Sequence, residues 1–89
     1  MKDSYLEVTY RHGRVLAAYY HLPGPEGRTS RRCRTFEPGM VVDYAQGGRP
    51  LGIEIVAPSK LTLRAFNRLL RELGAAPVEK NELAPLRAA

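Results

Sequence analysis

The chain has 89 residues, of which 14 are Lys or Arg and 9 are Asp or Glu, and its formal net charge is +5. A chain of this length fits one domain, and it can bury only about 60 to 65 per cent of the surface that its unfolded form exposes. The single cysteine, Cys33, cannot form an internal disulfide, and no cysteine and histidine cluster of the metal-binding type replaces it. We therefore expect a homodimer to supplement a modest core.

Signals for secretion or membrane insertion are not found in the sequence. Residues 1–10 lack a basic stretch followed by an apolar run, and nowhere do about 18 apolar residues follow one another. We therefore expect a soluble, cytoplasmic protein that has no membrane partner. The positive net charge favours acidic partners, which include nucleic acid, an acidic protein surface and anionic lipid.

Residues 5–10 and 15–22 predict the first two strands of a sheet. In the first, Leu6 and Val8 alternate with polar neighbours, and a period of two places each set on its own face. The second is rich in β-branched and aromatic residues, which suit a strand. Residues 11–14 predict a turn, so the two strands are expected to pair as a hairpin.

A third strand is predicted at residues 30–36, after a loop at residues 23–27 that is rich in proline and glycine. Alternation would place Arg32 and Arg34 on one face of this strand. The other face would receive Arg31, Cys33 and Thr35. A turn at residues 37–39 then reverses the chain.

The next two strands are predicted as a hairpin over residues 40–56. Gly47 and Gly48 can adopt the positive φ angles that a two-residue hairpin turn requires. The register then follows if Gln46 lies opposite Arg49. It places Tyr44 opposite Leu51, Val42 opposite Ile53 and Met40 opposite Ile55, as one apolar face. The other face would hold Val41, Asp43, Ala45, Gly52, Glu54 and Val56.

One helix is predicted between Thr62, a natural N-cap residue, and Gly74, a natural C-terminal stop. At about 100° per residue, its apolar side chains occupy an arc of roughly 120°. They are Leu63, Phe66, Leu69, Leu70 and Leu73. The opposite side of this helix holds Arg64, Arg68 and Arg71. We therefore expect the apolar side to lie on the sheet.

These elements together predict an α+β fold, an antiparallel β-meander of about five strands with one C-terminal amphipathic helix packed on one face. The domain is expected to span residues 1–74. Residues 75–89 lack a sustained apolar period, which predicts a flexible C-terminal tail or, at most, a short helix.

No pattern typical of an active site is found. His12 and His21 lack cysteine or acidic ligands at a metal-binding spacing, and the hairpin glycines are not followed by the GK[ST] of a phosphate-binding loop. We therefore expect no catalytic residue, no metal and no cofactor.

The carboxylate pair Asp43 and Glu54 has two interpretations. The register places the two residues diagonally on one face, roughly 7 to 8 Å apart at Cα. Such a pair could share a metal ion or divide acid and base roles. Arginines of residues 30–36 that face the pair across the sheet would instead make it an ordinary ion-paired surface, which we favour.

Two groups of arginines could contact phosphates. One group is Arg28, Arg31, Arg32 and Arg34, and the other is Arg64, Arg68 and Arg71 on the predicted helix. The sequence has no helix-turn-helix, no zinc finger and no aromatic strand motif of the RNA-binding type. A solvated basic surface is therefore favoured over specific recognition of nucleic acid.

Three segments carry a resemblance to a known family. Residues 18–22, AYYHL, are similar to a strand that reads LYIRL in that family, residues 38–44, PGMVVDY, to GVIVDYD, and residues 48–56, GRPLGIEIV, to GRLVGIEIL. On these segments the chain, from about Tyr10 to Lys60, resembles the YuzE-like family of small bacterial proteins, a domain of unknown function. It departs from the family at residues 11–16, where the family has an acidic DPEADAL segment.

The resemblance implies a binding protein, since the family has no established enzymatic activity. Some members are encoded beside small ribonuclease-like toxins and are presumed antitoxins, which would act by covering the surface of the toxin. A protein partner, such as a small toxin, is therefore what the resemblance implies.

The leading hypothesis is a small non-enzymatic protein-interaction module, antitoxin-like in its most specific form. The alternative is a basic nucleic-acid-binding module that uses the arginine groups. A third hypothesis is a metal-dependent or acid–base enzyme at Asp43 and Glu54. The candidate interaction residues are Arg31, Arg32, Arg34, Asp43, Glu54, Arg64, Arg68 and Arg71.

Overall fold

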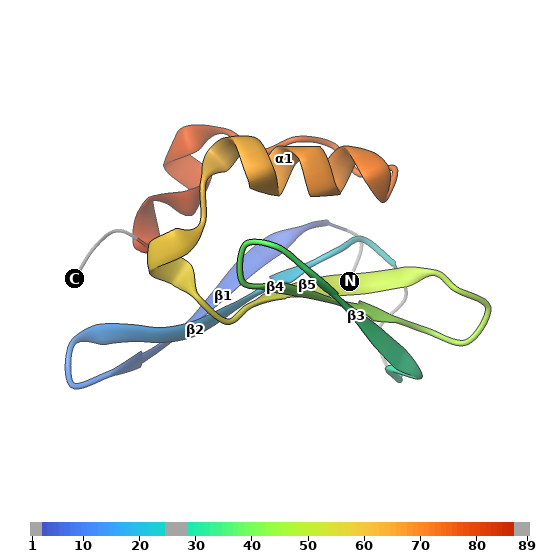
Figure 1. The fold of residues 1–89 in the computed structure, drawn as a ribbon, viewed down its shortest axis with the longest axis horizontal. Helices are drawn as coiled ribbons and strands as arrows, with labels where there is room; N and C mark the ends of the chain where they lie inside the picture. The colour runs from blue at the N-terminus through green and yellow to red at the C-terminus, as the bar shows by residue number, and fades with distance from the viewer. Residues whose placement is uncertain (1–2, 25–28, 87–89) are drawn as a thin grey trace.

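The computed structural model describes residues 3–24 and 29–86, and it shows a five-stranded antiparallel sheet with helical segments on one side (Figure 1). The strands are β1 (Tyr5–Arg11), β2 (Arg14–His21), β3 (Arg32–Phe36), β4 (Met40–Tyr44) and β5 (Pro50–Ile55). The helical segments are the 3₁₀ turns η1 (Pro58–Lys60) and η2 (Lys80–Leu86) and the helix α1 (Leu63–Glu72). The predicted α+β class is confirmed. Part of the predicted loop at 23–27 lies outside the described residues.

The strands lie in the order β1-β2-β5-β4-β3 across the sheet. The runs β1–β2 and β3–β4–β5 are each consecutive and antiparallel, as a meander requires. A meander in strict chain order would place β3 beside β2, however, and β5 occupies that position. The result is that Ile53 and Ile55 of β5, both fully buried, lie at the middle of the sheet.

The predicted register of the β4–β5 hairpin is confirmed along most of its length. Met40 lies opposite Ile55 and Val42 opposite Ile53, and all four side chains are buried. Because side chains alternate across a strand, this register also fixes which residues of β4 and β5 lie on the opposite face.

The end of this hairpin differs from the prediction. The register shifts after Asp43, so Tyr44 lies opposite Pro50 instead of Leu51. The amide of Ala45 donates to the Arg49 carbonyl at 2.8 Å, which leaves a three-residue turn rather than a two-residue one. Gly47 and Gly48 both have positive φ, 93° and 87°, so the turn uses the conformational freedom that the sequence predicts.

Helix α1 begins and ends where its capping residues predict. The Thr62 hydroxyl oxygen accepts a hydrogen bond from the Ala65 amide at 3.1 Å. At the other end Gly74 has a φ of 76°, and the Ala75 amide donates to the Leu70 carbonyl at 2.8 Å. This pattern is a Schellman motif, which satisfies carbonyl groups of the last turn.

The core lies between α1 and the sheet face beneath it. Phe66 is fully buried, and its ring meets the ring of Tyr20 edge to face, with centroids 5.2 Å apart. Leu69 and Leu70 are buried beside it, while Leu63 and Leu73 are partly buried against the same cluster. The sheet contributes Ala18, Tyr20, Leu22, Met40, Val42, Tyr44, Ile53 and Ile55.

Residues 75–86 differ from the predicted flexible tail, because they complete the core. Val78, Leu83 and Leu86 are at most 6% exposed. The Asn67 side chain holds this segment on α1, since its Nδ2 donates to the Val78 carbonyl at 3.1 Å and its Oδ1 accepts from the Val78 amide at 2.8 Å. The three apolar residues are too irregularly spaced to give a periodic signal. The last predicted tail residues, 87–89, lie outside the described residues.

Candidate functional site

The sheet face that points away from α1 is the candidate functional site, and we call it the outer face. In Figure 1 the helical segments of the described chain all lie on the other side of the sheet. Strand register and alternation assign its residues. They are Tyr5, Glu7, Thr9, Arg11, Arg14, Ala17, Tyr19, His21, Cys33, Thr35, Val41, Asp43, Gly52 and Glu54, with Val56 directly after β5.

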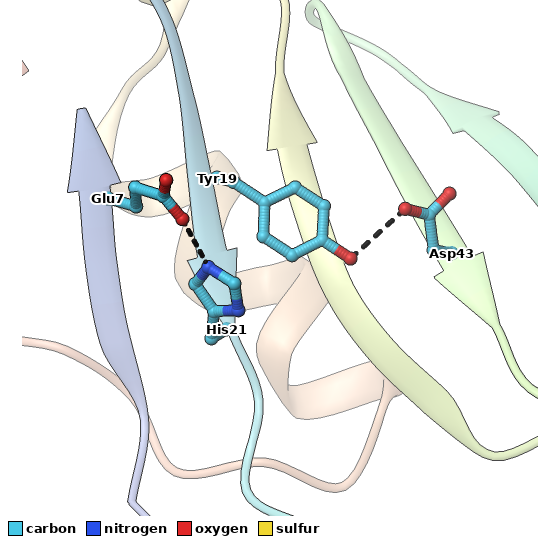
Figure 2. Close-up of polar contacts among 4 residues, drawn as sticks. All are labelled: Glu7, Tyr19, His21 and Asp43. Carbon is cyan, nitrogen blue, oxygen red and sulfur yellow. Dashed lines mark hydrogen bonds and ion pairs between the residues drawn. The ribbon is translucent and has the colours of Figure 1, made fainter. Parts of the chain in front are cut away.

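Three residues of β1 and β2 hold one another at one end of the outer face. The Nε2 atom of His21 lies 2.7 Å from the Oε1 atom of Glu7 (Figure 2). The ring of Tyr5, which lies directly opposite His21, stacks on the imidazole with centroids 4.2 Å apart and planes within 9°. The contact of Glu7 at the edge of the imidazole ring and the stacking of Tyr5 on its plane together fix the orientation of the imidazole.

Tyr19 reaches across the neighbouring strand to Asp43. Its hydroxyl donates to the Oδ2 atom of Asp43 at 3.0 Å, although Tyr19 belongs to β2 and Asp43 to β4 (Figure 2). The intervening residue on β5 is Gly52, and a Cβ atom there would lie only 2.7 Å from Cζ and from the hydroxyl oxygen of Tyr19. The missing side chain of Gly52 is therefore what lets the ring cross β5.

The His21–Glu7 contact and the Tyr19–Asp43 contact form one continuous row, because the rings of Tyr19 and His21 also meet. Their centroids are 4.7 Å apart, with the planes tilted by 58°. The row thus runs from Glu7 and His21 through Tyr19 to Asp43. It presents carboxylate oxygens and aromatic edges in a fixed arrangement, which suits recognition of a binding partner.

The other chemistry-bearing residues of the face lie beside members of this row, and Glu54 is directly opposite Tyr19. Cys33 is exposed on the edge strand β3, directly opposite Asp43. Among residues 3–24 and 29–86, no group of three or more His, Cys, Asp or Glu side chains is placed to hold a metal ion.

The structure places Asp43 and Glu54 on the outer face, diagonally across β4 and β5 as predicted. Asp43 lies opposite Gly52, and Glu54 lies opposite Val41. Glu54 is exposed and Asp43 is half-buried.

The predicted pairing of these carboxylates with the arginines of β3 is wrong for Arg32 and Arg34. Both lie on the face that α1 covers, where the Arg32 guanidinium is 5.0 Å from the centroid of the Tyr44 ring and the Arg34 guanidinium 5.0 Å from that of Phe36. These are cation–π contacts at the margin of the core, and both arginines are exposed.

Arg28 lies outside the described residues, and the remaining predicted arginines lie in two further places. Arg31 precedes the edge strand β3, is exposed, and donates its amide to the Tyr44 carbonyl at 2.8 Å. Arg64, Arg68 and Arg71 are exposed on α1, as predicted. The eight candidate residues therefore do not form one site, because the sheet separates the α1 arginines from Asp43 and Glu54.

Sequence reasoning missed Tyr5, Glu7, Tyr19 and His21 as members of one site. A weak signal exists. Tyr5 and Glu7 are two residues apart in one predicted strand, as are Tyr19 and His21 in the next, so the two members of each pair share a face. The register was the missing information, because the β1–β2 pairing is irregular between Thr9 and Tyr10. Contact with Asp43 further requires that β5 lie beside β2.

The Tyr19 contact predicts strong coupling between Gly52 and Tyr19. We expect Gly52→Ala to lower the free energy of unfolding by about 1 to 2 kcal/mol, because the ring must move and its bond to Asp43 breaks. In a Tyr19→Ala background the same change should be neutral or stabilising by up to about 1 kcal/mol, because glycine weakens a strand interior. Urea unfolding of the four proteins measures this cycle, and additive effects would contradict the contact.

Comparison of the chain with protein-family models, with curated proteins and with solved structures finds no match. The resemblance to the YuzE-like family therefore stays a prediction. Within the described ranges, no helix combines the length and the apolar character that crossing a membrane requires.

Proposed function

We propose that the chain is a small protein-interaction module that works by binding, not by catalysis, and that the outer face is its binding surface. The observation that carries this proposal is a sheet that the described residues cover on one side only, with an ordered aromatic and carboxylate row on the other. Tyr5 and Val56 are 41% and 49% exposed there, which adds apolar area that a partner can bury.

The composition of the outer face supports a protein partner. Tyrosine is enriched at protein interfaces, because its ring offers apolar area and its hydroxyl offers a hydrogen bond. The side chains of Tyr19 and His21 are already held by Asp43, Glu7 and Tyr5, so little side-chain entropy would be lost on binding. An antitoxin-like role, which the family resemblance implies, would be one specific form of this function.

A second candidate function is nucleic-acid binding by α1. The observation that favours it is that Arg64, Arg68 and Arg71 are all exposed on this helix. The outer face itself suits nucleic acid poorly, since its carboxylates repel phosphates and the rings of Tyr5 and His21 stack on each other rather than lie open to bases. The two candidates therefore use opposite sides of the molecule.

Capture of the partner by two matched double variants tests the proposal. The tagged full chain should recover one protein in stoichiometric amount from its native host. Tyr5→Ala with Val56→Ser should reduce this recovery by about tenfold, because interface energy concentrates in a few exposed aromatic and apolar residues. Arg64→Ser with Arg68→Ser, on the other side of the molecule, should leave it unchanged.

Each outcome of this experiment decides between the candidates. Recovery of no stoichiometric protein would contradict the proposal. Loss of the captured protein only in the α1 variant would place its binding site on the helix instead. Nucleic-acid binding by α1 would show a logarithm of affinity that falls linearly with the logarithm of salt concentration, and Arg64→Ala, Arg68→Ala and Arg71→Ala together should abolish it.

A further inference from the structure

The part of the outer face around Tyr19 carries negative charge, although the net charge of the chain is +5. Its three carboxylates are Glu7 on β1, Asp43 on β4 and Glu54 on β5. Glu54 is exposed on the central strand. Of the described lysines and arginines, Arg11 and Arg14 lie opposite each other at the far end of the β1–β2 hairpin and alternate to the outer face, and Arg31 precedes the edge strand β3. The others lie on α1, on the α1 side of β3, or in turns, and they are Arg32, Arg34, Arg49, Lys60, Arg64, Arg68, Arg71 and Lys80.

The carboxylates keep capacity to accept further hydrogen bonds. Glu7 uses its Oε1 atom toward His21, and Asp43 uses its Oδ2 atom toward Tyr19. A carboxylate has two oxygens and about four acceptor positions, so each group can still bind a donor from outside. Glu7 is 61% exposed and therefore reachable by a partner.

We infer that the outer face binds a basic protein surface, one that presents arginine side chains to Glu7, Glu54 and Asp43. This inference rests on the proposed function and names the chemistry of the partner. Tyr5 lies two residues from Glu7 on the same face and is 41% exposed. A guanidinium can stack on such a ring and at the same time donate two parallel hydrogen bonds to a carboxylate, which an ammonium cannot do.

Charge argues against a second copy of the chain as the occupant of this face. A two-fold dimer brings the same patch of both copies together. A two-fold axis through the part of the face around Tyr19 would collect the carboxylates of Glu7, Asp43 and Glu54 from both copies in one interface, and like charges across an interface oppose binding. The expected homodimer, if it forms, should use another surface.

A titration with a capped hexa-arginine peptide tests the inference, with ¹⁵N-labelled full-length chain observed by NMR. Saturable shifts are expected at the amides of Glu7, Gly52 and Glu54, and the affinity should fall as salt rises. The net charge of the chain repels this peptide, so non-specific attraction by the whole chain does not account for such shifts. Capped hexa-glutamate should produce no shifts on the outer face.

Two glutamate variants supply the matched control. Glu54→Gln removes a charge from the outer face and should weaken peptide binding by about threefold. Glu72→Gln removes the same charge from an exposed position on α1 and should have no effect. Equal effects of the two variants, or shifts that do not map to the outer face, would overturn the inference.

Failure of the inference is distinguishable from failure of the proposed function. If the outer face captures a protein partner but does not bind hexa-arginine, the proposed function stands and the basic character of the partner is wrong. If hexa-arginine binds the outer face but the host supplies no protein partner, the charge chemistry stands and the proposed function is wrong.

Discussion

Removal of residues 75–89 is expected to leave a chain that does not unfold cooperatively. The deletion takes Val78, Leu83 and Leu86 out of the core, each at most 6% exposed in the structure. Full burial of each such side chain contributes about 1.5 to 3 kcal/mol. The whole stability of a domain of this size is about 4 to 13 kcal/mol, so the loss consumes most of it. Circular dichroism during thermal and urea unfolding measures the result.

Point variants in the full-length chain separate loss of packing from loss of length. Val78→Ala, Leu83→Ala and Leu86→Ala together should reproduce the effect of the deletion. Lys80→Ala with Asn81→Ala changes exposed residues of the same segment and should alter the free energy of unfolding by less than about 0.5 kcal/mol. A deleted chain that still unfolds cooperatively, with a midpoint close to that of the full chain, would show that the segment is dispensable.

The elements of the sheet could be predicted because their signals are local. Alternation in β4 and β5, with Gly47 and Gly48 between them, suffices to place Val42 opposite Ile53. Thr62 and Gly74 mark the ends of α1 through hydrogen bonds to residues within a few positions. Each of these features depends on residues that are close in sequence, so a single sequence is enough to predict it.

The arrangement of the strands could not be predicted in this way. Pairing of β2 with β5 places Tyr20 opposite Ile53, and these residues are far apart in sequence. The contact of Tyr19 with Asp43 depends on that pairing, because the ring must cross β5 at Gly52. The candidate site was therefore recognised only through Asp43 and Glu54, whose shared face follows from one local hairpin.

The arginines show the limit of reading charge from sequence. Arg32 and Arg34 look like part of a basic binding cluster, but each guanidinium lies over an aromatic ring at the margin of the core. The positive net charge likewise conceals a carboxylate-bearing face, because charge is distributed by strand alternation and not by position along the chain. Net charge alone does not reveal this face.

Phe66→Ala is expected to lower the free energy of unfolding by about 3 to 5 kcal/mol, because it leaves a cavity under α1. Phe66 is fully buried and meets Tyr20 edge to face, so the change also removes a specific ring contact between helix and sheet. For a domain of this size the melting temperature should fall by about 15 to 30 °C. Differential scanning calorimetry measures both quantities.

Leu16→Ala is the control for this prediction, because Leu16 is 55% exposed and its truncation should shift the melting temperature by only a few degrees. Equal effects of the two variants would mean that α1 does not close the core. The outer face lies on the other side of the sheet from Phe66, so the fraction of Phe66→Ala protein that stays folded should keep the affinity for hexa-arginine that the unchanged chain is expected to show. Stability would then depend on one face of the sheet and binding on the other, so the outer-face residues remain available to bind a partner.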